Sequence, residues 1–312
     1  MAPAEQATKT TQSGPQRPGT LTSMKRLIIR CGIAVSAFAL WSLAAFAAES
    51  PQPLFSLVGM SGGMGQAAML KEAGAEFLTV GVGDLLVPDK PEAEFEKKLA
   101  EAGKCPLPVL ACNGFIRPKN LRCVGEDATP ELVLEWADTT FRRAKKAGVK
   151  FIVFGSGGSR QLKDGWPREK ADEQFIALLK KMGPLAEAQG VTVVLEQLND
   201  GECNYITRIA EGAKIVRAVG HPSIRLLGDL YHMAKMGDTP EDLAQAMDVI
   251  VHMEIAEKEG RTAPGVQGDD FRPFFKVLRK AGYRGAVSLE GKWKPEQLPK
   301  AFETIKGQAA EG

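Results

Sequence analysis

The sequence predicts a single (β/α)8 barrel, a TIM barrel, over residues 53–305, and three observations support this fold class. Eight short runs rich in β-branched and aromatic residues alternate with longer amphipathic segments. No long linker interrupts this alternation, and about 250 residues suffice for one such barrel. The competing fold, an open doubly wound sheet, is disfavoured because no Gly-x-Gly-x-x-Gly turn follows the first run.

The apolar runs have the length and composition of strands in a parallel sheet, which is covered on both faces. The expected strands are 54–58, 76–82, 107–111, 150–154, 191–196, 224–229, 249–255 and 285–290. Amphipathic helices are expected between them, most clearly over 130–147, 171–189 and 270–281. Glycines that end helices just before a strand support these boundaries, at Gly74, Gly148, Gly190 and Gly282.

Composition excludes several classes of protein. The chain has 312 residues, of which 44% are hydrophobic and 25% charged, as in an ordinary globular protein rather than a disordered or coiled-coil chain. A mean hydropathy of −0.14 excludes a membrane protein with many spans. The formal charge of +2 gives no electrostatic reason to expect nucleic acid as a partner.

The first 47 residues have the pattern of a leader that ends in a secretory signal peptide. A basic start at Met24, Lys25 and Arg26 precedes an uncharged apolar stretch over 31–46 and a small-residue exit that ends at Ala47. We expect cleavage near Ala47, a true start at Met24, and a secreted or periplasmic protein that does not stay at the membrane. The alternative is an uncleaved anchor, although 16 uncharged residues are fewer than the roughly 20 of a spanning helix.

Removal of this leader changes the sign of the net charge. The leader carries five basic residues and one acid, so the 40 basic and 38 acidic residues of the chain become 35 and 37. Four cysteines remain, and an exported protein meets an oxidising compartment. The four are Cys105, Cys112, Cys123 and Cys203. The sequence leaves open whether they form a disulfide bond or remain buried free thiols.

Four carboxylates lie at or near the carboxyl ends of the last four expected strands: Glu196, Asp229, Glu254 and Glu290. The carboxyl ends of barrel strands meet at one mouth, where active sites are built. One such acid alone is usually an exposed loop residue or a helix cap. Four on consecutive strands would repel one another strongly unless a divalent cation neutralised them, so the pattern predicts a metal site.

The chain resembles the xylose isomerase-like barrels, the sugar phosphate isomerase/epimerase superfamily that includes hydroxypyruvate isomerases and ketose 3-epimerases. The resemblance extends from about Phe55 to Trp293. The segments that carry it are FGSGGSR at 154–160, LEQLN at 195–199, DLYHM at 229–233, HMEIAE at 252–257 with Gly260-Arg261, and GYRG at 282–285. The chain has only three histidines, too few for the multi-zinc site of the related barrel endonucleases.

The resemblance implies a role for each of several residues. Metal ligands would be Glu196, Asp229, Glu254 and Glu290; substrate contacts would be His232, Glu202, Arg261 and His252. Glu254 departs from the family, which has a neutral His or Gln there, and His252 is an alternative third ligand. An all-oxygen set favours Mg²⁺, Mn²⁺ or Ca²⁺ over zinc, and we expect Mn²⁺ or Mg²⁺. At the position of Asp200 the family often has Arg, so recognition of a phosphate or carboxylate is in doubt.

Such a site suits proton transfer next to a carbonyl group. We expect a metal-dependent sugar isomerase or epimerase in which Glu196 and Glu290 remove and return a proton of a sugar or hydroxy-carbonyl substrate, through an enediolate. Two alternatives stay open at this point: a lyase or hydrolase acting on a keto-sugar, and a non-catalytic sugar-binding barrel. The sequence does not decide whether the protein forms a homo-oligomer.

Overall fold

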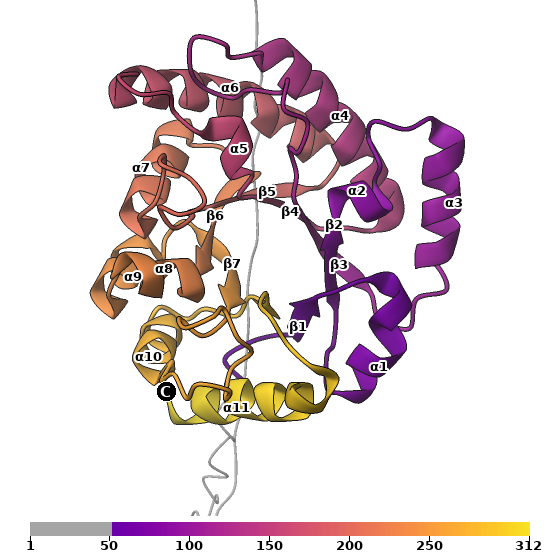
Figure 1. The fold of residues 1–312 in the computed structure, drawn as a ribbon, viewed down its shortest axis with the longest axis vertical. Coiled ribbons are helices and arrows are strands. Elements are labelled where there is room, and N and C mark those ends of the chain that lie inside the picture. Colours follow the sequence, from indigo (N-terminus) through magenta and orange to yellow (C-terminus); the bar gives the residue numbers. More distant parts are fainter. Residues whose placement is uncertain (1–51) are drawn as a thin grey trace, which may run out of the picture. The chain divides into compact units, whose positions relative to one another are not determined.

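The computed structural model describes residues 52–312, and the predicted leader and its cleavage site lie outside these residues. The described part forms a closed barrel of eight parallel strands in chain order, with β8 paired to β1 (Figure 1). The strands are β1 (Val58–Ser61), β2 (Leu78–Gly81), β3 (Val109–Asn113), β4 (Phe151–Phe154), β5 (Thr192–Glu196), β6 (Ile224–Asp229), β7 (Ile250–Ile255) and β8 (Val287–Leu289). The predicted TIM barrel is therefore confirmed.

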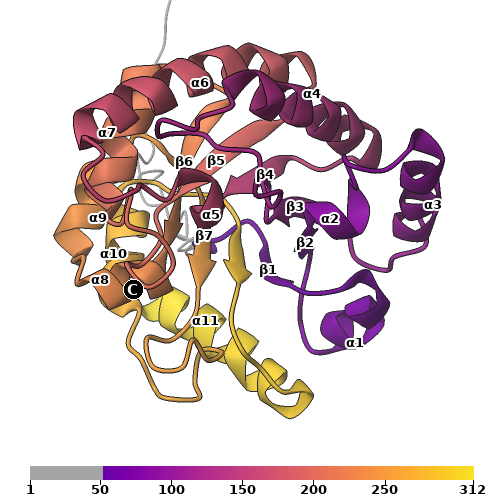
Figure 2. The ribbon, with the colours of Figure 1, turned by 45° about the horizontal axis from the view of Figure 1, so that its top comes forward.

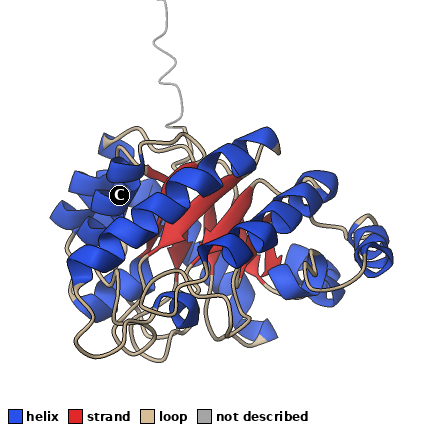
Figure 3. Ribbon diagram, turned by 90° about the horizontal axis from the view of Figure 1, so that it is seen from above, coloured by secondary structure: helices blue, strands red, loops and turns tan. Residues whose placement is uncertain are grey.

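Helices surround the strands on the outside, as the view from above shows (Figure 3). They are α1 (Ala67–Glu72), α2 (Val82–Leu85), α3 (Glu92–Ala102), α4 (Pro130–Ala147), α5 (Gly157–Arg160), α6 (Arg168–Ala188), α7 (Ile209–Val219), α8 (Leu230–Met236), α9 (Pro240–Ala246), α10 (Arg272–Lys280) and α11 (Leu298–Glu311), with 3-10 turns η1 (Met64–Gln66) and η2 (Pro295–Gln297). None of the helices over residues 52–312 has both the length and the apolar composition to cross a membrane.

Helix α4 illustrates how local sequence sets these boundaries. Pro130 occupies the first helical position, where its missing N–H costs no hydrogen bond. Gly148 ends the helix with a left-handed φ of 73°, which a glycine adopts without strain. Between them, Val133, Ala137, Phe141 and Ala144 are buried at helical spacings. The predicted helix 130–147 thus has the observed bounds.

The first strand lies later than predicted. The expected strand 54–58 overlaps β1 only at Val58. Leu54 and Phe55 are buried, but Phe55 packs edge-on against Phe275 and Tyr283 ahead of the strand rather than within the sheet. An apolar run therefore packs against the amino-terminal end of the barrel, and hydropathy does not distinguish such a segment from a strand.

Side chains fill the inside of the barrel. Ala111, Val153, Val194 and Leu227 form one packed layer. The ring of His252 stacks on Phe151 at a centroid distance of 5.1 Å and lies tilted beside Phe77 at 6.2 Å. This packing makes the interior a core, so any binding site must lie at the strand ends.

Candidate active site and metal centre

Four carboxylates from β5 to β8 meet at the carboxyl-terminal mouth. Glu196 and Asp229 are the last residues of β5 and β6, Glu254 pairs with Asp229 across β6 and β7, and Glu290 directly follows β8. One oxygen from each of the four lies within 4.8 Å of the others. The structure thus brings together the four acids that the sequence singles out.

Three of these carboxylates are buried and Glu290 is partly exposed, and three of their oxygens accept no hydrogen bond among the described residues. Glu254 is 0% exposed, and neither of its oxygens accepts a hydrogen bond within the described residues. The two oxygens of Asp229 differ: Oδ1 accepts from the backbone N–H groups of Tyr231 and His232 at the start of α8, while Oδ2 accepts no hydrogen bond among the described residues. Unsatisfied buried oxygens facing one another are the donor set that a hard divalent cation prefers.

The electrostatics of the cluster favour proton uptake when no cation is bound. Burial raises the pKa of Glu254 well above its usual value, and repulsion from the other three carboxylates raises it further. Burial and the charge of Glu196 raise the pKa of Glu290 to about 7, against the opposing effect of Arg261. A carboxyl group that titrates near neutral pH is suited to general acid–base catalysis.

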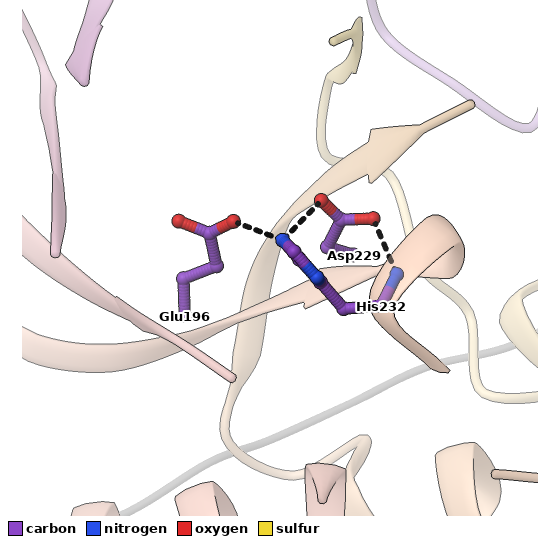
Figure 4. Close-up of side chains that lie close together, drawn as sticks. All are labelled: Glu196, Asp229 and His232. Carbon is purple, nitrogen blue, oxygen red and sulfur yellow. Dashed lines mark hydrogen bonds and ion pairs between the residues drawn. The ribbon is translucent and has the colours of Figure 1, made fainter. Parts of the chain in front are cut away.

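His232 lies in the first turn of α8 and is fully buried beside two of the acids (Figure 4). Its Nδ1 accepts a hydrogen bond from the backbone N–H of Asn199 at 3.0 Å, which places the proton of the neutral ring on Nε2. Nε2 is 3.3 Å from Glu196 Oε1 and 3.6 Å from Asp229 Oδ2. Burial alone lowers the pKa of His232, but the two carboxylates outweigh burial and raise it.

Arg261 reaches the cluster from the loop after β7. Its Nη2 lies 2.6 Å from Glu290 Oε2 and 3.6 Å from Asp229 Oδ2, and its Nη1 lies 3.4 Å from Glu202 Oε1. The guanidinium stacks over Tyr231, 4.7 Å from the ring centroid. Among the described residues, Arg261 is the only lysine or arginine that lines the mouth of the barrel. Its guanidinium already contacts three carboxylates.

Glu257 builds the loop that carries Arg261. Its buried carboxylate accepts from the Thr262 hydroxyl and from the backbone N–H groups of Gly265, Gln267 and Gly268. Burial by itself raises the pKa of Glu257, but these donors lower it below the usual value. The sequence reasoning did not find this role, because the donors are backbone groups that carry no signal in the sequence.

Asn113, at the end of β3, is a second functional residue that the sequence reasoning missed. Its Nδ2 donates to Glu290 Oε1 at 2.6 Å, so it fixes the orientation of that carboxylate. The expected strand 107–111 stopped two residues short of the observed end. With β3 extended to Asn113, a polar side chain at a strand end would have been the detectable signal.

A cavity of about 370 Å³ opens beside the cluster. Glu196, Glu202, Arg261, Glu290 and Asn113 line one part of it, and the backbone of residues 155–158 lines another. In Figure 2 the short helix α5, which begins within this backbone segment at Gly157, lies over the mouth of the barrel near β5 and β6. A Cβ atom at Gly155 would collide with Glu196 Oε2, so only glycine leaves that carboxylate its place.

The structure does not bring His252 to this cavity, contrary to its expected contact with substrate. His252 and Glu254 are on the same face of β7, but His252 lies one repeat deeper, inside the barrel. It is 0% exposed, and neither ring nitrogen has a hydrogen-bond partner among the described residues. Burial lowers its pKa to about 4, so the ring is neutral. The alternative that His252 replaces Glu254 as a ligand therefore has no geometric support.

All four cysteines that follow the leader are free in the described part of the chain. Cys112 and Cys123 are buried, and burial raises the pKa of Cys123 to about 11. A thiol held in its protonated form is a poor nucleophile. Cys112 and Cys123 therefore act as small apolar residues of the core.

Comparison of the sequence with known proteins identifies the family of the chain. The sequence profile of the xylose isomerase-like TIM barrels matches residues 67–308. An inosose isomerase of Halalkalibacterium halodurans is 32% identical over 127 residues, which are 37% of this chain and 44% of that protein. The chain matches about half the length of the curated relatives that it resembles.

Solved structures show the same fold at low identity. A 3-keto-D-glucoside 4-epimerase from E. coli superposes with a TM-score of 0.67 and 21% identity, covering 80% of this chain and 98% of that one. The IolI protein, with a bound zinc atom, superposes with a TM-score of 0.65 and 18% identity, covering 82% of this chain and 98% of that one.

Proposed function

Because the chain belongs to the xylose isomerase-like TIM barrel family, we propose that it is a divalent-metal-dependent sugar isomerase or epimerase. The observation that carries this proposal is the meeting of four carboxylates at the ends of β5 to β8, three of them buried, with oxygens of Asp229 and Glu254 that accept no hydrogen bond among the described residues. Glu196, Asp229, Glu254 and Glu290 would hold the ion, with Mn²⁺ or Mg²⁺ preferred over zinc because all the donors are oxygens.

Proton transfer next to the carbonyl falls to Glu196 and Glu290. Burial and the charge of Glu196 raise the pKa of Glu290 in the metal-free protein to about 7, which supports a role for this group in acid–base chemistry near neutral pH. Glu196 lies beside the Nε2 proton of His232, which holds its carboxylate in place and stabilises its charge. When bound, the divalent ion supplies positive charge that stabilises the enediolate oxygens of the substrate.

The charge of the cavity favours an uncharged sugar over an anionic hydroxy-acid. The carboxylates outnumber the guanidinium, and Arg261 is already engaged by Glu290, Asp229 and Glu202. A carboxylate or phosphate on the substrate would find no free cation among the residues that line the cavity. Asp200, in place of the family's frequent arginine, is consistent with this preference.

The test is solvent deuterium uptake at the carbon next to the carbonyl, followed by NMR for a panel of ketoses, aldoses and hydroxypyruvate. We expect uptake with an uncharged sugar in the presence of Mn²⁺ or Mg²⁺, and its loss in Glu196→Gln and Glu290→Gln. Glu303→Gln is the matched control, because Glu303 is exposed and, among residues 52–312, forms an ion pair only with Lys300. If both active-site variants keep native uptake, the acid–base assignment is refuted.

A second candidate is a sugar-binding barrel without catalysis, and Glu254 is the observation that favours it. A carboxylate at a position where the family has a neutral ligand adds negative charge, which weakens the pull of a bound ion on substrate oxygens. Solvent deuterium uptake by the Mn²⁺-loaded protein separates the two: the enzyme exchanges the proton next to the carbonyl group, and a barrel that binds sugar without catalysis does not.

We also propose that the protein is exported, on the basis of its leader. The basic start, the short apolar stretch and the small-residue exit at Ala47 support removal of the leader by a signal peptidase. Amino-terminal sequencing of the protein from the extracytoplasmic fraction should begin just after Ala47. An intact leader on protein recovered from the membrane would instead support the uncleaved anchor.

A further inference from the structure

Arg160, the last residue of α5, is a fully buried cation whose guanidinium binds backbone carbonyl groups. Its Nε donates to the Gly155 carbonyl at 2.8 Å, and its Nη2 donates to the Glu196 carbonyl at 2.7 Å. Its Nη1 donates to the carbonyls of Tyr205 and Ile206. No carboxylate lies within ion-pair distance of Arg160 among residues 52–312, although it is 0% exposed.

Burial of a cation without a carboxylate partner is costly, so this arrangement calls for a reason. The three segments that Arg160 joins are the turn after β4, the end of β5 and the loop before α7. Two of them contain residues in the left-handed region, Ser156 at φ 40° and Ile206 at φ 62°. Such backbone is strained for non-glycine residues, above all for a β-branched one, and persists only where surrounding contacts enforce it.

The hydrogen bonds of Arg160 reach the candidate metal centre through the backbone. Gly155 and Glu196, whose carbonyls it binds, are the pair whose close approach leaves no room for a Cβ atom beside Glu196 Oε2. The separation of these two backbone segments therefore sets where the Glu196 carboxylate lies.

We propose that Arg160 is a positioning residue for the metal centre. It holds β4 and β5 together through their carbonyl groups, so that the Glu196 carboxylate faces Asp229, Glu254 and Glu290. This inference rests on the proposed metal site. Residues that orient a ligand without touching the ion change metal affinity by about 10- to 100-fold when they are replaced.

The experiment measures the Mn²⁺ dissociation constant by calorimetry, together with the EPR spectrum of bound Mn²⁺. Arg160→Met removes the charge and the hydrogen bonds while it keeps most of the apolar stem; Arg160→Lys keeps the charge and loses the planar fork. The matched control is Arg143→Met. Arg143 is also buried, at 4% exposure, and donates to the carbonyls of Leu86, Val87 and Lys90, but none of these lines the cavity.

We expect Arg160→Met to raise the dissociation constant about 10- to 100-fold and to change the EPR spectrum. Arg160→Lys should fall between Arg160→Met and the native protein, and Arg143→Met should stay within about twofold of native binding. An unchanged dissociation constant in Arg160→Met, or an equal weakening in Arg143→Met, overturns the inference.

Two other outcomes are also decisive. If Arg160→Met does not fold, a folded Arg160→Lys with native affinity and a native spectrum overturns the positioning role, since lysine cannot reproduce the guanidinium fork. If the native protein itself binds no Mn²⁺, the proposed metal-dependent function fails, which is a different result from equal binding by the native and Arg160→Met proteins.

Discussion

Replacement of Glu254 by Gln should move stability and metal affinity in opposite directions. Glu254 is fully buried, and neither of its oxygens has a hydrogen-bond partner within the described chain. Its ligand oxygen lies within 4.8 Å of an oxygen from each of three other carboxylates. At an effective dielectric constant of about 20, two unit charges at that distance repel by about 3 kcal/mol.

The expected gain in stability is smaller than the sum of these repulsions, because the metal-free protein can protonate Glu254 instead. Protonation costs about 1.4 kcal/mol for each pH unit above the pKa of the group. We therefore expect Glu254→Gln to raise the free energy of unfolding of the metal-free protein at pH 8, by at most the roughly 5 kcal/mol that protonation from the ordinary pKa of 4.5 costs at that pH. The same change removes a charged ligand, so Mn²⁺ should bind about tenfold more weakly or worse.

Two measurements test this prediction. Urea unfolding at pH 8 in the presence of EDTA gives the stability of the metal-free proteins, and calorimetry with Mn²⁺ gives the affinity. Glu303→Gln, on the exposed surface, should change neither quantity. A metal-free Glu254→Gln protein that is less stable than the native protein at pH 8 would refute the reasoning, because it would show that no repulsion acts on Glu254.

Three further predictions concern the surroundings of the carboxylates. The pKa of Glu290 is raised in the folded protein to about 7, so its contribution to the stability of the metal-free protein is fully present below about pH 4.5 and is lost as pH rises through 7. This loss amounts to about 3 kcal/mol in the free energy of unfolding. Urea unfolding at a series of pH values should show it in the native protein and not in Glu290→Gln. Asn113→Ala removes a hydrogen bond that lowers the pKa of Glu290. The limb of the pH–rate profile that reports Glu290 should therefore move to higher pH. A limb that stays in place would contradict the assignment of that limb to Glu290. Gly155→Ala should reduce Mn²⁺ affinity and turnover at least about tenfold, because the added methyl group collides with Glu196 Oε2. Gly307→Ala, on α11 and outside the described lining of the cavity, meets no atom within 4 Å of the added methyl group and should leave both unchanged.

The sequence alone was sufficient to predict the barrel and the four acids at its mouth. Short apolar runs that alternate with amphipathic helices specify parallel strands, and a barrel of such strands places every carboxyl end on one side. Glu196, Asp229, Glu254 and Glu290 therefore had to converge once they were assigned to strand ends. This part of the site depends only on the order of residues along the chain, which is why it could be predicted.

The tertiary structure decided what depends on depth and on contacts between distant segments. His252 and Glu254 share a face of β7, but at about 3.3 Å per residue they lie roughly 6.6 Å apart along the strand, so only Glu254 reaches the mouth. Phe55 packs ahead of β1 because Phe275 and Tyr283, more than 200 residues later, are there to receive it. The periodicity of a sequence indicates which face of a strand a residue is on. It does not indicate how far along the barrel axis the residue lies or which distant residue it contacts.

The sequence also could not predict which charged side chains pair with one another in the site. Arg261 contacts Glu290 and Glu202 from a loop that Glu257 organises through backbone N–H groups, and Arg160 contacts Glu196 through its carbonyl. Backbone donors and acceptors are the same at every position, so no residue type marks them in advance. The identity of the acids followed from the chain, whereas the groups that hold and balance them were set by the fold.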